Sequence, residues 1–125
     1  MAGRRAARRT ALFLLYQWDV TGQPLESLYE GEIDAFAHEL TEAVYARAPE
    51  LDAAITAAAE GWTADRLGAV ERNVLRIGAY ELETASVPPE VAINEAVELA
   101  KRYASEDAAR LVNGILGRIA RERVP

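Results

Sequence analysis

The feature that most constrains the fold is the spacing of the apolar residues, which recur three or four positions apart along most of the chain. This spacing places them on one face of an α-helix, where 3.6 residues complete a turn. A half-buried β-strand needs alternating apolar and polar residues rich in Val, Ile and Thr, and such runs are hard to find here. The sequence therefore predicts an all-α fold.

Proline, glycine and capping residues divide the helical pattern into segments. We expect helices over residues 4–21, 33–47, 50–60 and 69–83, a short turn over 63–67, a helix through 93–103 and a last helix after 105. Ser105 is a good N-cap because its hydroxyl can accept a hydrogen bond from a free backbone amide, and Thr63 is a plausible cap for the short turn. Gly114 lies inside the last helix, where close helix packing is the usual reason for a glycine.

A chain of 125 residues fits a single domain over residues 1–125. We expect two packed helical subdomains in one compact domain, an N-terminal half over about 4–61 and a C-terminal half over about 62–122. The first three helices could form one small bundle. Leu99 and Ile115 fall on apolar helix faces and are expected in the core.

The composition argues against several kinds of chemistry. The chain has no cysteine and one histidine, which excludes a disulfide framework and a His/Cys zinc site. Its glycines are scattered, so no phosphate-binding loop and no nucleotide cofactor are implied. Carboxylate pairs such as Glu95 and Glu98 are common on helix surfaces, and His38 has no evident catalytic partner. We expect a protein that is not an enzyme, with no cofactor or metal, and a cytoplasmic one, because no apolar run could span a membrane.

Charge is distributed unevenly along the chain. Residues 1–9 carry four arginines and no acid, residues 10–107 carry a net charge of −13, and residues 108–125 carry a net charge of +3. An acidic body with basic ends indicates that any anion binding is confined to where those ends lie.

The four N-terminal arginines, Arg4, Arg5, Arg8 and Arg9, fall on one arc of the first predicted helix. Guanidinium groups bind phosphate bidentately and keep their charge, so this arc is a candidate site for a nucleic-acid backbone. From charge alone, a solvated and partly frayed N-terminus is an equally good reading. Tyr16 lies near the arc and could either stack on an unpaired base or pack in the core.

Several segments carry a distinctive pattern. In the middle of the chain they are GWTADRL at 61–67, VER at 70–72, LR at 75–76 and YEL at 80–82. Further along they are VP at 87–88, VAINEAVELAK at 91–101, ED at 106–107 and VNGIL at 112–116. In order and spacing these segments resemble the NusB family, and the resemblance covers about residues 4–119. The N-terminal half matches more loosely, and Phe13 stands where relatives often have glutamine.

The resemblance implies an all-α fold of two helical subdomains and a role in antitermination of ribosomal RNA transcription. Members of the family bind single-stranded boxA-type RNA together with NusE, a small-subunit ribosomal protein, and join an antitermination complex on RNA polymerase. By motif, the RNA role carries over to the four N-terminal arginines and, more weakly, to Asp107 and Leu111. Glu71 in the VER motif would face NusE.

Two other functions remain open at this stage. A NusB-like domain also forms the N-terminal part of certain ribosomal RNA cytosine methyltransferases, but no glycine-rich cofactor-binding domain follows it in this sequence. The chain could also be a protein-only adaptor that does not bind RNA.

Overall fold

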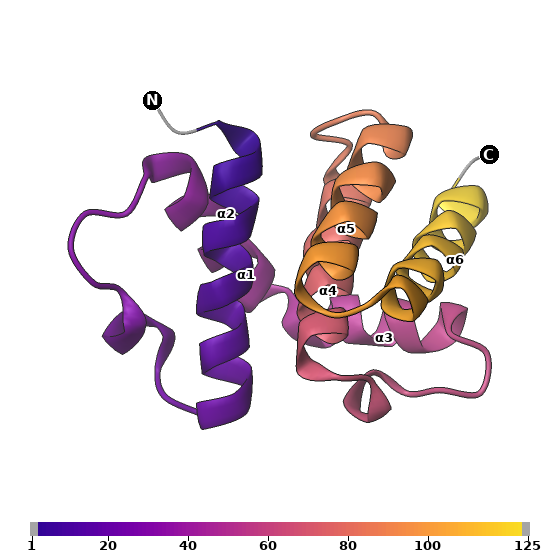
Figure 1. The fold of residues 1–125 in the computed structure, drawn as a ribbon, viewed down its shortest axis with the longest axis horizontal. Coiled ribbons are helices and arrows are strands. Elements are labelled where there is room, and N and C mark those ends of the chain that lie inside the picture. The colour runs from indigo at the N-terminus through magenta and orange to yellow at the C-terminus, as the bar shows by residue number, and fades with distance from the viewer. Residues whose placement is uncertain (1–2, 124–125) are drawn as a thin grey trace.

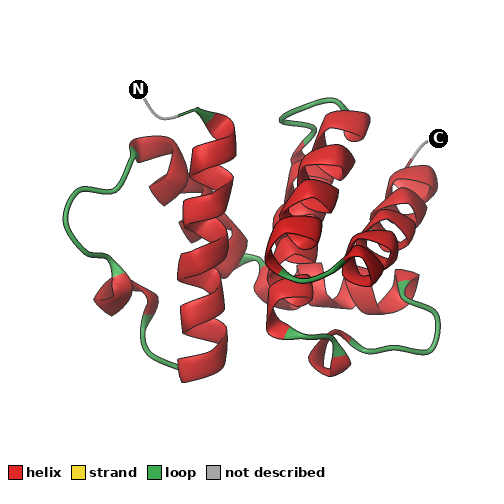
Figure 2. Ribbon diagram, in the orientation of Figure 1, coloured by secondary structure: helices red, strands yellow, loops and turns green. Residues whose placement is uncertain are grey.

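The computed structural model describes residues 3–123, and every regular element in that range is helical (Figures 1 and 2). The elements are α1 (Arg4–Thr21), η1 (Leu25–Leu28), α2 (Ala35–Ala46), α3 (Ala48–Ala58), η2 (Ala64–Arg66), α4 (Ala69–Thr84), α5 (Pro89–Tyr103) and α6 (Glu106–Arg123), where η marks a 3-10 helix. The all-α prediction is confirmed. Among the described residues, no helix combines the length and the apolar composition that crossing a membrane requires.

The helix ends show why these residues form these elements. The backbone N–H of Ala108 donates to Oγ of Ser105 at 3.0 Å, which is the expected cap of α6. Asp34 caps α2 by accepting from the N–H of Ala37 at 3.2 Å. The cap expected at Thr63 does not form, because the Thr63 hydroxyl donates to the carboxylate of Asp65 instead.

The helices form two groups that differ from the expected division. In Figure 1, α1 and α2 lie together on one side, and α3 lies with α4, α5 and α6 on the other. The three-helix bundle expected for the N-terminal half is therefore not formed, since α3 packs mainly on α4 and α6. Its apolar face, with Leu51 and Ile55, is buried in the core that these helices share. The chain crosses between the two groups at Arg47, between α2 and α3.

One apolar core runs through both groups and includes Leu15, Val44, Leu75 and Leu116. Ile115 is buried with 4% of its surface exposed, as expected. Leu99 is only partly buried, contrary to expectation, because it lies at the edge of α5 and lines a surface groove described below. Truncation of Leu99 should therefore cost less stability than truncation of Ile115.

The glycine at the closest helix contact is Gly78 rather than Gly114. A Cβ added to Gly78 would lie 2.6 Å from Cδ1 of Leu116, so this glycine lets α4 approach α6. A Cβ added to Gly114 would have no heavy atom of another residue within 4 Å. The expectation of close packing at Gly114 is wrong, because the glycine is exposed where α6 lines an open groove.

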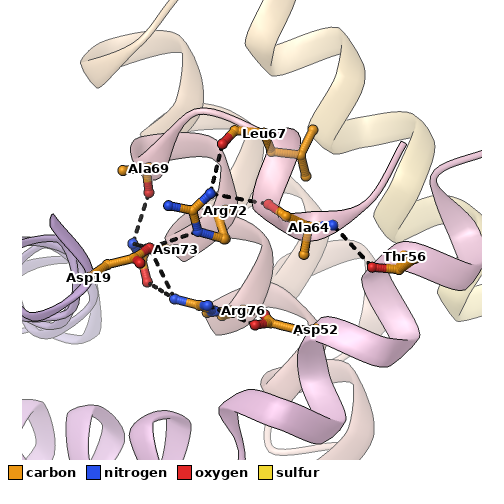
Figure 3. A network of polar contacts seen from close by, with 9 residues as sticks. All are labelled: Asp19, Asp52, Thr56, Ala64, Leu67, Ala69, Arg72, Asn73 and Arg76. Atoms are coloured by element: carbon orange, nitrogen blue, oxygen red, sulfur yellow. Dashed lines mark hydrogen bonds and ion pairs between the residues drawn. The ribbon is translucent and has the colours of Figure 1, made fainter. Parts of the chain in front are cut away.

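A polar network joins α1 to α4 and α3 (Figure 3). Asp19 on α1 accepts from Nε of Arg72 at 2.7 Å and from Nδ2 of Asn73 at 3.0 Å. Arg76 donates to Asp19 at 3.2 Å and makes two bonds of 2.7 Å to Asp52 on α3. Burial raises the pKa of Asp19, but the hydrogen bond from Arg72 and the charges of Arg76 and Arg72 outweigh burial and hold that pKa below its ordinary value.

Arg72 also donates to the backbone carbonyls of Ala64 and Leu67, so it holds the loop before α4 in place. Within residues 3–123, every buried side-chain nitrogen and oxygen has a hydrogen-bond partner. The arginines of the VER and LR sequence motifs thus join the two helix groups and are not free for a ligand.

Candidate functional site

The first candidate site is a groove of about 410 Å³ between α1 and α5. Arg5, Arg8 and Arg9 line it from α1, and the residues that line it from α5 are Asn94, Glu95, Glu98, Leu99, Arg102 and Tyr103. The groove therefore combines cationic and anionic side chains. The accessibility of each arginine decides what the groove can bind.

Arg8 is the exception among the N-terminal arginines, because its side chain is only 4% exposed. Its guanidinium makes a two-bond contact with the Glu81 carboxylate, with Nε to Oε1 and Nη2 to Oε2 both at 2.8 Å. Nη1 reaches Glu95 at 3.3 Å. The hydrogen bond to Glu81 raises the pKa of Arg8 against the effect of burial, and the negative charges of Glu81 and Glu95 add to this.

The prediction that Arg8 belongs to an open cationic edge is therefore wrong. Helical periodicity places Arg8 on the arc, but only the packing of α4 against α1 reveals that Glu81 faces it. Arg8 fastens α1 to α4 and α5.

The remaining arginines of the arc are accessible. The Arg5 side chain is 83% exposed, and its Nε donates to Glu95 at 3.0 Å. Arg4 is exposed, and its guanidinium carbon lies 5.0 Å from the centroid of the Phe36 ring. Arg9 is partly exposed and makes no ion pair with an acidic side chain in residues 3–123. Together, these three residues (Arg4, Arg5 and Arg9) form the basic edge of α1.

Arg102, near the end of α5, is a groove residue that the sequence analysis missed. It is exposed, and its guanidinium carbon lies 5.6 Å from the centroid of the Tyr103 ring. The only sequence feature that could have indicated it is the adjacent pair of basic residues, Lys101 and Arg102. Only the parallel run of α5 beside α1 (Figure 1) places Arg102 in the same groove as Arg5 and Arg9.

An aromatic hollow adjoins the basic edge along α1 and is lined by Leu12, Phe13, Tyr16, Val70 and Tyr103. The rings of Phe13 and Tyr103 meet edge to face with centroids 5.2 Å apart. Tyr16 is 38% exposed, which excludes the alternative that it is a core residue.

Glu71 lies in the first turn of α4, next to Val70 of the aromatic hollow. It is partly exposed, and its carboxylate folds back toward Gly68, the N-cap of α4. An acid in a first helical turn complements the helix dipole, so Glu71 has a structural role as well as an accessible charge.

Asp107 and Leu111 lie apart from the groove between α1 and α5. Asp107 is exposed in the first turn of α6 and pairs with Arg110. Leu111 is partly buried and lines a second groove, between α3 and α6. The predicted site residues thus occupy three surfaces, the basic edge, the aromatic hollow with Glu71 and the start of α6.

The profile of the NusB family matches residues 5–121, nearly the whole chain. The chain belongs to the NusB family. Among NusB relatives, a transcription antitermination protein of Rubrobacter xylanophilus is 46% identical over 120 residues, which cover 90% of this chain and 86% of the relative.

Solved NusB structures agree with this assignment. NusB of T. maritima is 35% identical, with a TM-score of 0.86 over 99% of this chain and 94% of that one. A chain from the crystal structure of the antitermination factors NusB and NusE in complex with dsRNA is also 35% identical, with a TM-score of 0.84 over 95% of this chain and 96% of that one. The NusB resemblance seen in the sequence motifs is thus confirmed over the whole fold.

Proposed function

We propose that this NusB-family protein is a transcription antitermination factor that binds boxA-type single-stranded RNA of ribosomal RNA transcripts together with NusE. The pair would join the antitermination complex on RNA polymerase in the cytoplasm, and the protein would act by binding rather than by catalysis. One observation carries the proposal, an accessible basic edge of Arg4, Arg5 and Arg9 on a chain whose residues 10–107 carry a net charge of −13. The relatives named as antitermination proteins, and the similar chain from a complex with NusE and dsRNA, support it.

In this proposal the basic edge neutralises phosphates, and α1 sets the direction of the RNA. Arg5 and Arg9 lie one turn apart, and Tyr16 lies two further turns along nearly the same face of α1. Tyr16 would stack on an unpaired base, because every base offers a π-face to an aromatic ring. Asp107 and Leu111 would contact RNA at the start of α6, the carboxylate by accepting from an exocyclic amine and the leucine by apolar contact.

The protein partner NusE would contact the surface at Glu71. A basic ribosomal protein is attracted to an acidic body, and opposite charges across an interface steer association. The aromatic hollow next to Glu71 offers the apolar contact area that protein interfaces favour. Since Tyr16 lines this hollow, the RNA and protein surfaces would adjoin, and a bound partner would extend the RNA site.

A protein-only adaptor is the competing function, and one contact favours it. Arg5 donates to Glu95, and Glu98 also lines the groove, so acidic groups oppose a phosphate there. The Arg5 guanidinium is on the solvent side of this pair, while Glu95 is also held by Arg8, so a phosphate that approaches Arg5 can replace the Glu95 contact.

The test is a titration of boxA-type and scrambled RNA against the wild type and Arg5→Ala/Arg9→Ala, with and without NusE. The double variant should lose RNA affinity in both settings and keep its circular dichroism spectrum. Arg66→Ala, which removes an exposed arginine outside the grooves, is the control for loss of a surface arginine elsewhere and should bind as the wild type does. Wild-type RNA affinity in the double variant would leave the adaptor as the function.

The protein interface is tested by reversing the charge of Glu71. Glu71→Lys should weaken NusE binding, since it places a positive charge against a basic partner. Glu71→Gln, which removes the charge at nearly constant size, should have a smaller effect in the same calorimetric titration. Thermal unfolding of both variants reports any loss of the helix-dipole interaction. NusE affinity equal to wild type in Glu71→Lys would remove Glu71 from the interface.

A further inference from the structure

The second groove, between α3 and α6, has exposed lining residues that take no part in the core. Its walls combine the end of α3, the loop that carries Trp62, and one face of α6 with Arg110, Gly114, Arg118 and Arg121. These four positions are spaced by four, four and three residues, so they share one side of the helix. The groove is open to solvent along its length.

Trp62 is the largest exposed aromatic group on this surface, with 51% of its area accessible. It follows two residues with left-handed backbones, Glu60 at φ 33° and Gly61 at φ 87°. Such a conformation is costly for glutamate and persists only where the surrounding structure requires it. The turn carries Trp62 alongside α6 while leaving half of the side chain uncovered.

Gly114 keeps the middle of the groove open. It lies between Arg110 and Arg118 on the lining face of α6, where a Cβ would meet no other residue within 4 Å. A glycine inside a helix lowers helix stability, and the missing side chain leaves this part of the groove unfilled.

The charge of the groove is carried by three arginines. Arg121 makes no ion pair with any acidic side chain in the described range, and Arg110 pairs only with its helix neighbour Asp107. Arg118 pairs with Glu60 and Glu122, whose side chains are 74% and 61% exposed. These exposed pairs are weak contacts that an incoming phosphate can displace.

From these observations we infer that the groove between α3 and α6 is a second contact site for single-stranded RNA, where Trp62 stacks on an unpaired base and Arg110 and Arg121 bind the flanking phosphates. An exposed aromatic ring beside arginines suits single-stranded nucleic acid, because stacking and phosphate neutralisation act together. Leu111, which lines the same groove, connects it with the RNA surface proposed at the start of α6. The inference rests on the proposed RNA-binding function and extends the RNA path across α6.

Tryptophan fluorescence gives a direct test, because the chain has only two tryptophans, Trp18 and Trp62. Trp18 is partly buried, edge to face with Tyr45, and Trp18→Phe keeps an aromatic ring there. A boxA-type RNA extended on both sides should quench the emission of Trp18→Phe in parallel with binding followed by anisotropy. Trp62→Phe, in which only Trp18 emits, should show little change. If Trp18→Phe does not fold, the RNA-induced quenching of wild type minus that of Trp62→Phe gives the contribution of Trp62.

Affinity for the same extended RNA gives the second test. Trp62→Ala should lower it about 5- to 100-fold, the range for loss of one base stack, and Trp62→Phe should retain most of it. Arg121→Ala should reduce the magnitude of the slope of log K against log salt by about 0.7 relative to wild type. Arg66→Ala, away from the groove, should change neither quantity.

The outcomes separate this inference from the proposed function. If Trp62→Ala and Arg121→Ala bind like wild type and no quenching occurs, while Arg5→Ala/Arg9→Ala is impaired, the groove is not an RNA site and the proposed function stands. Loss of NusE binding in Trp62→Ala with unchanged RNA affinity would assign the groove to a protein and overturn the inference. Absence of RNA binding by the wild type, with and without NusE, would remove both.

Discussion

Single residues of the same type have different roles in this protein, as the N-terminal arginines show. Arg5 is 83% exposed and Arg8 is 4% exposed, although they are three positions apart on α1. The difference lies in the partner, because Glu81 of α4 meets Arg8 with a carboxylate that is also buried. A buried charge must be paired, so Arg8 and Glu81 depend on each other.

Removal of one partner of this pair should therefore be costly. Glu81→Ala leaves the Arg8 guanidinium buried without its main acceptor and should lower the free energy of unfolding by about 3 to 5 kcal/mol, measured by urea denaturation. Arg8→Met/Glu81→Met, which replaces both charges by apolar groups, should recover much of that loss. Arg5→Ala is the matched control for an exposed pair with Glu95 and should cost at most about 1 kcal/mol. Equal losses in Glu81→Ala and Arg5→Ala would contradict the structural role of Arg8.

Asp19 should make stability depend on acid pH. Its folded pKa lies below the ordinary value, so its contribution is complete above that value and disappears as the pH falls through the folded pKa. We expect the midpoint temperature of thermal unfolding to decrease when the pH is lowered below about 4. In Asp19→Asn this acid limb, the decrease at low pH, should be shallower, and the midpoint temperature at neutral pH should be lower than in the wild type. The exposed Asp107→Asn serves as control and should follow the wild-type profile. An unchanged acid limb in Asp19→Asn would show that the network in Figure 3 does not depend on this charge.

At the scale of the helices, sequence patterns predicted the position of each α-helix within a few residues. The largest error is at the start of α5, expected near residue 93 but found at Pro89. Proline is tolerated in the first helical turn because the amide it lacks has no partner there, so the helix can begin before its apolar stripe does. The short helix η1 has no stripe of its own and was not predicted.

Two glycines in helices offer a matched pair of substitutions. Gly78→Ala should destabilise the protein by about 1 to 3 kcal/mol, since the new Cβ would overlap Leu116 and force α4 from α6. Gly114→Ala should stabilise it by up to about 1 kcal/mol, because alanine is the better helix former and nothing blocks its Cβ. Chemical denaturation of both variants checks the prediction. A loss of stability in Gly114→Ala would mean that α6 packs more tightly than this structure shows.

At the scale of the whole molecule, the fold separates surfaces of different charge. The basic edge lies at the beginning of α1, the arginines of α6 lie on the opposite helix group, and residues 10–107 carry a net charge of −13. This acidic body should repel RNA that is not held by a basic surface. RNA binding should therefore be weak without a partner that adds positive charge.

The salt dependence of RNA binding reports how many arginines take part. With Arg8 buried, a short boxA-type RNA on the basic edge should meet three arginines, which gives a slope of log K against log salt near −2 at about −0.7 per phosphate. Arg5→Ala/Arg9→Ala should reduce the magnitude of the slope to about 0.7. Titrations at several salt concentrations measure both slopes. A wild-type slope near −3, reduced in magnitude by about 0.7 in a folded Arg8→Met/Glu81→Met variant, would indicate that Arg8 also reaches phosphate.

The helical class, the main helix positions and the separation of charge were predictable from local sequence patterns, because each follows from residues close together in the chain. The remaining features depend on how the helices pack. This packing placed α3 with the C-terminal helices, paired Arg8 with Glu81, brought Arg102 beside α1 and set Trp62 against α6. These contacts join residues far apart in the chain, and local periodicity carries no information about which helix faces meet. For that reason, four arginines that look alike in the sequence have different environments in the fold. Three of them are accessible at the surface, and Arg8 is buried in an ion pair that joins two helices.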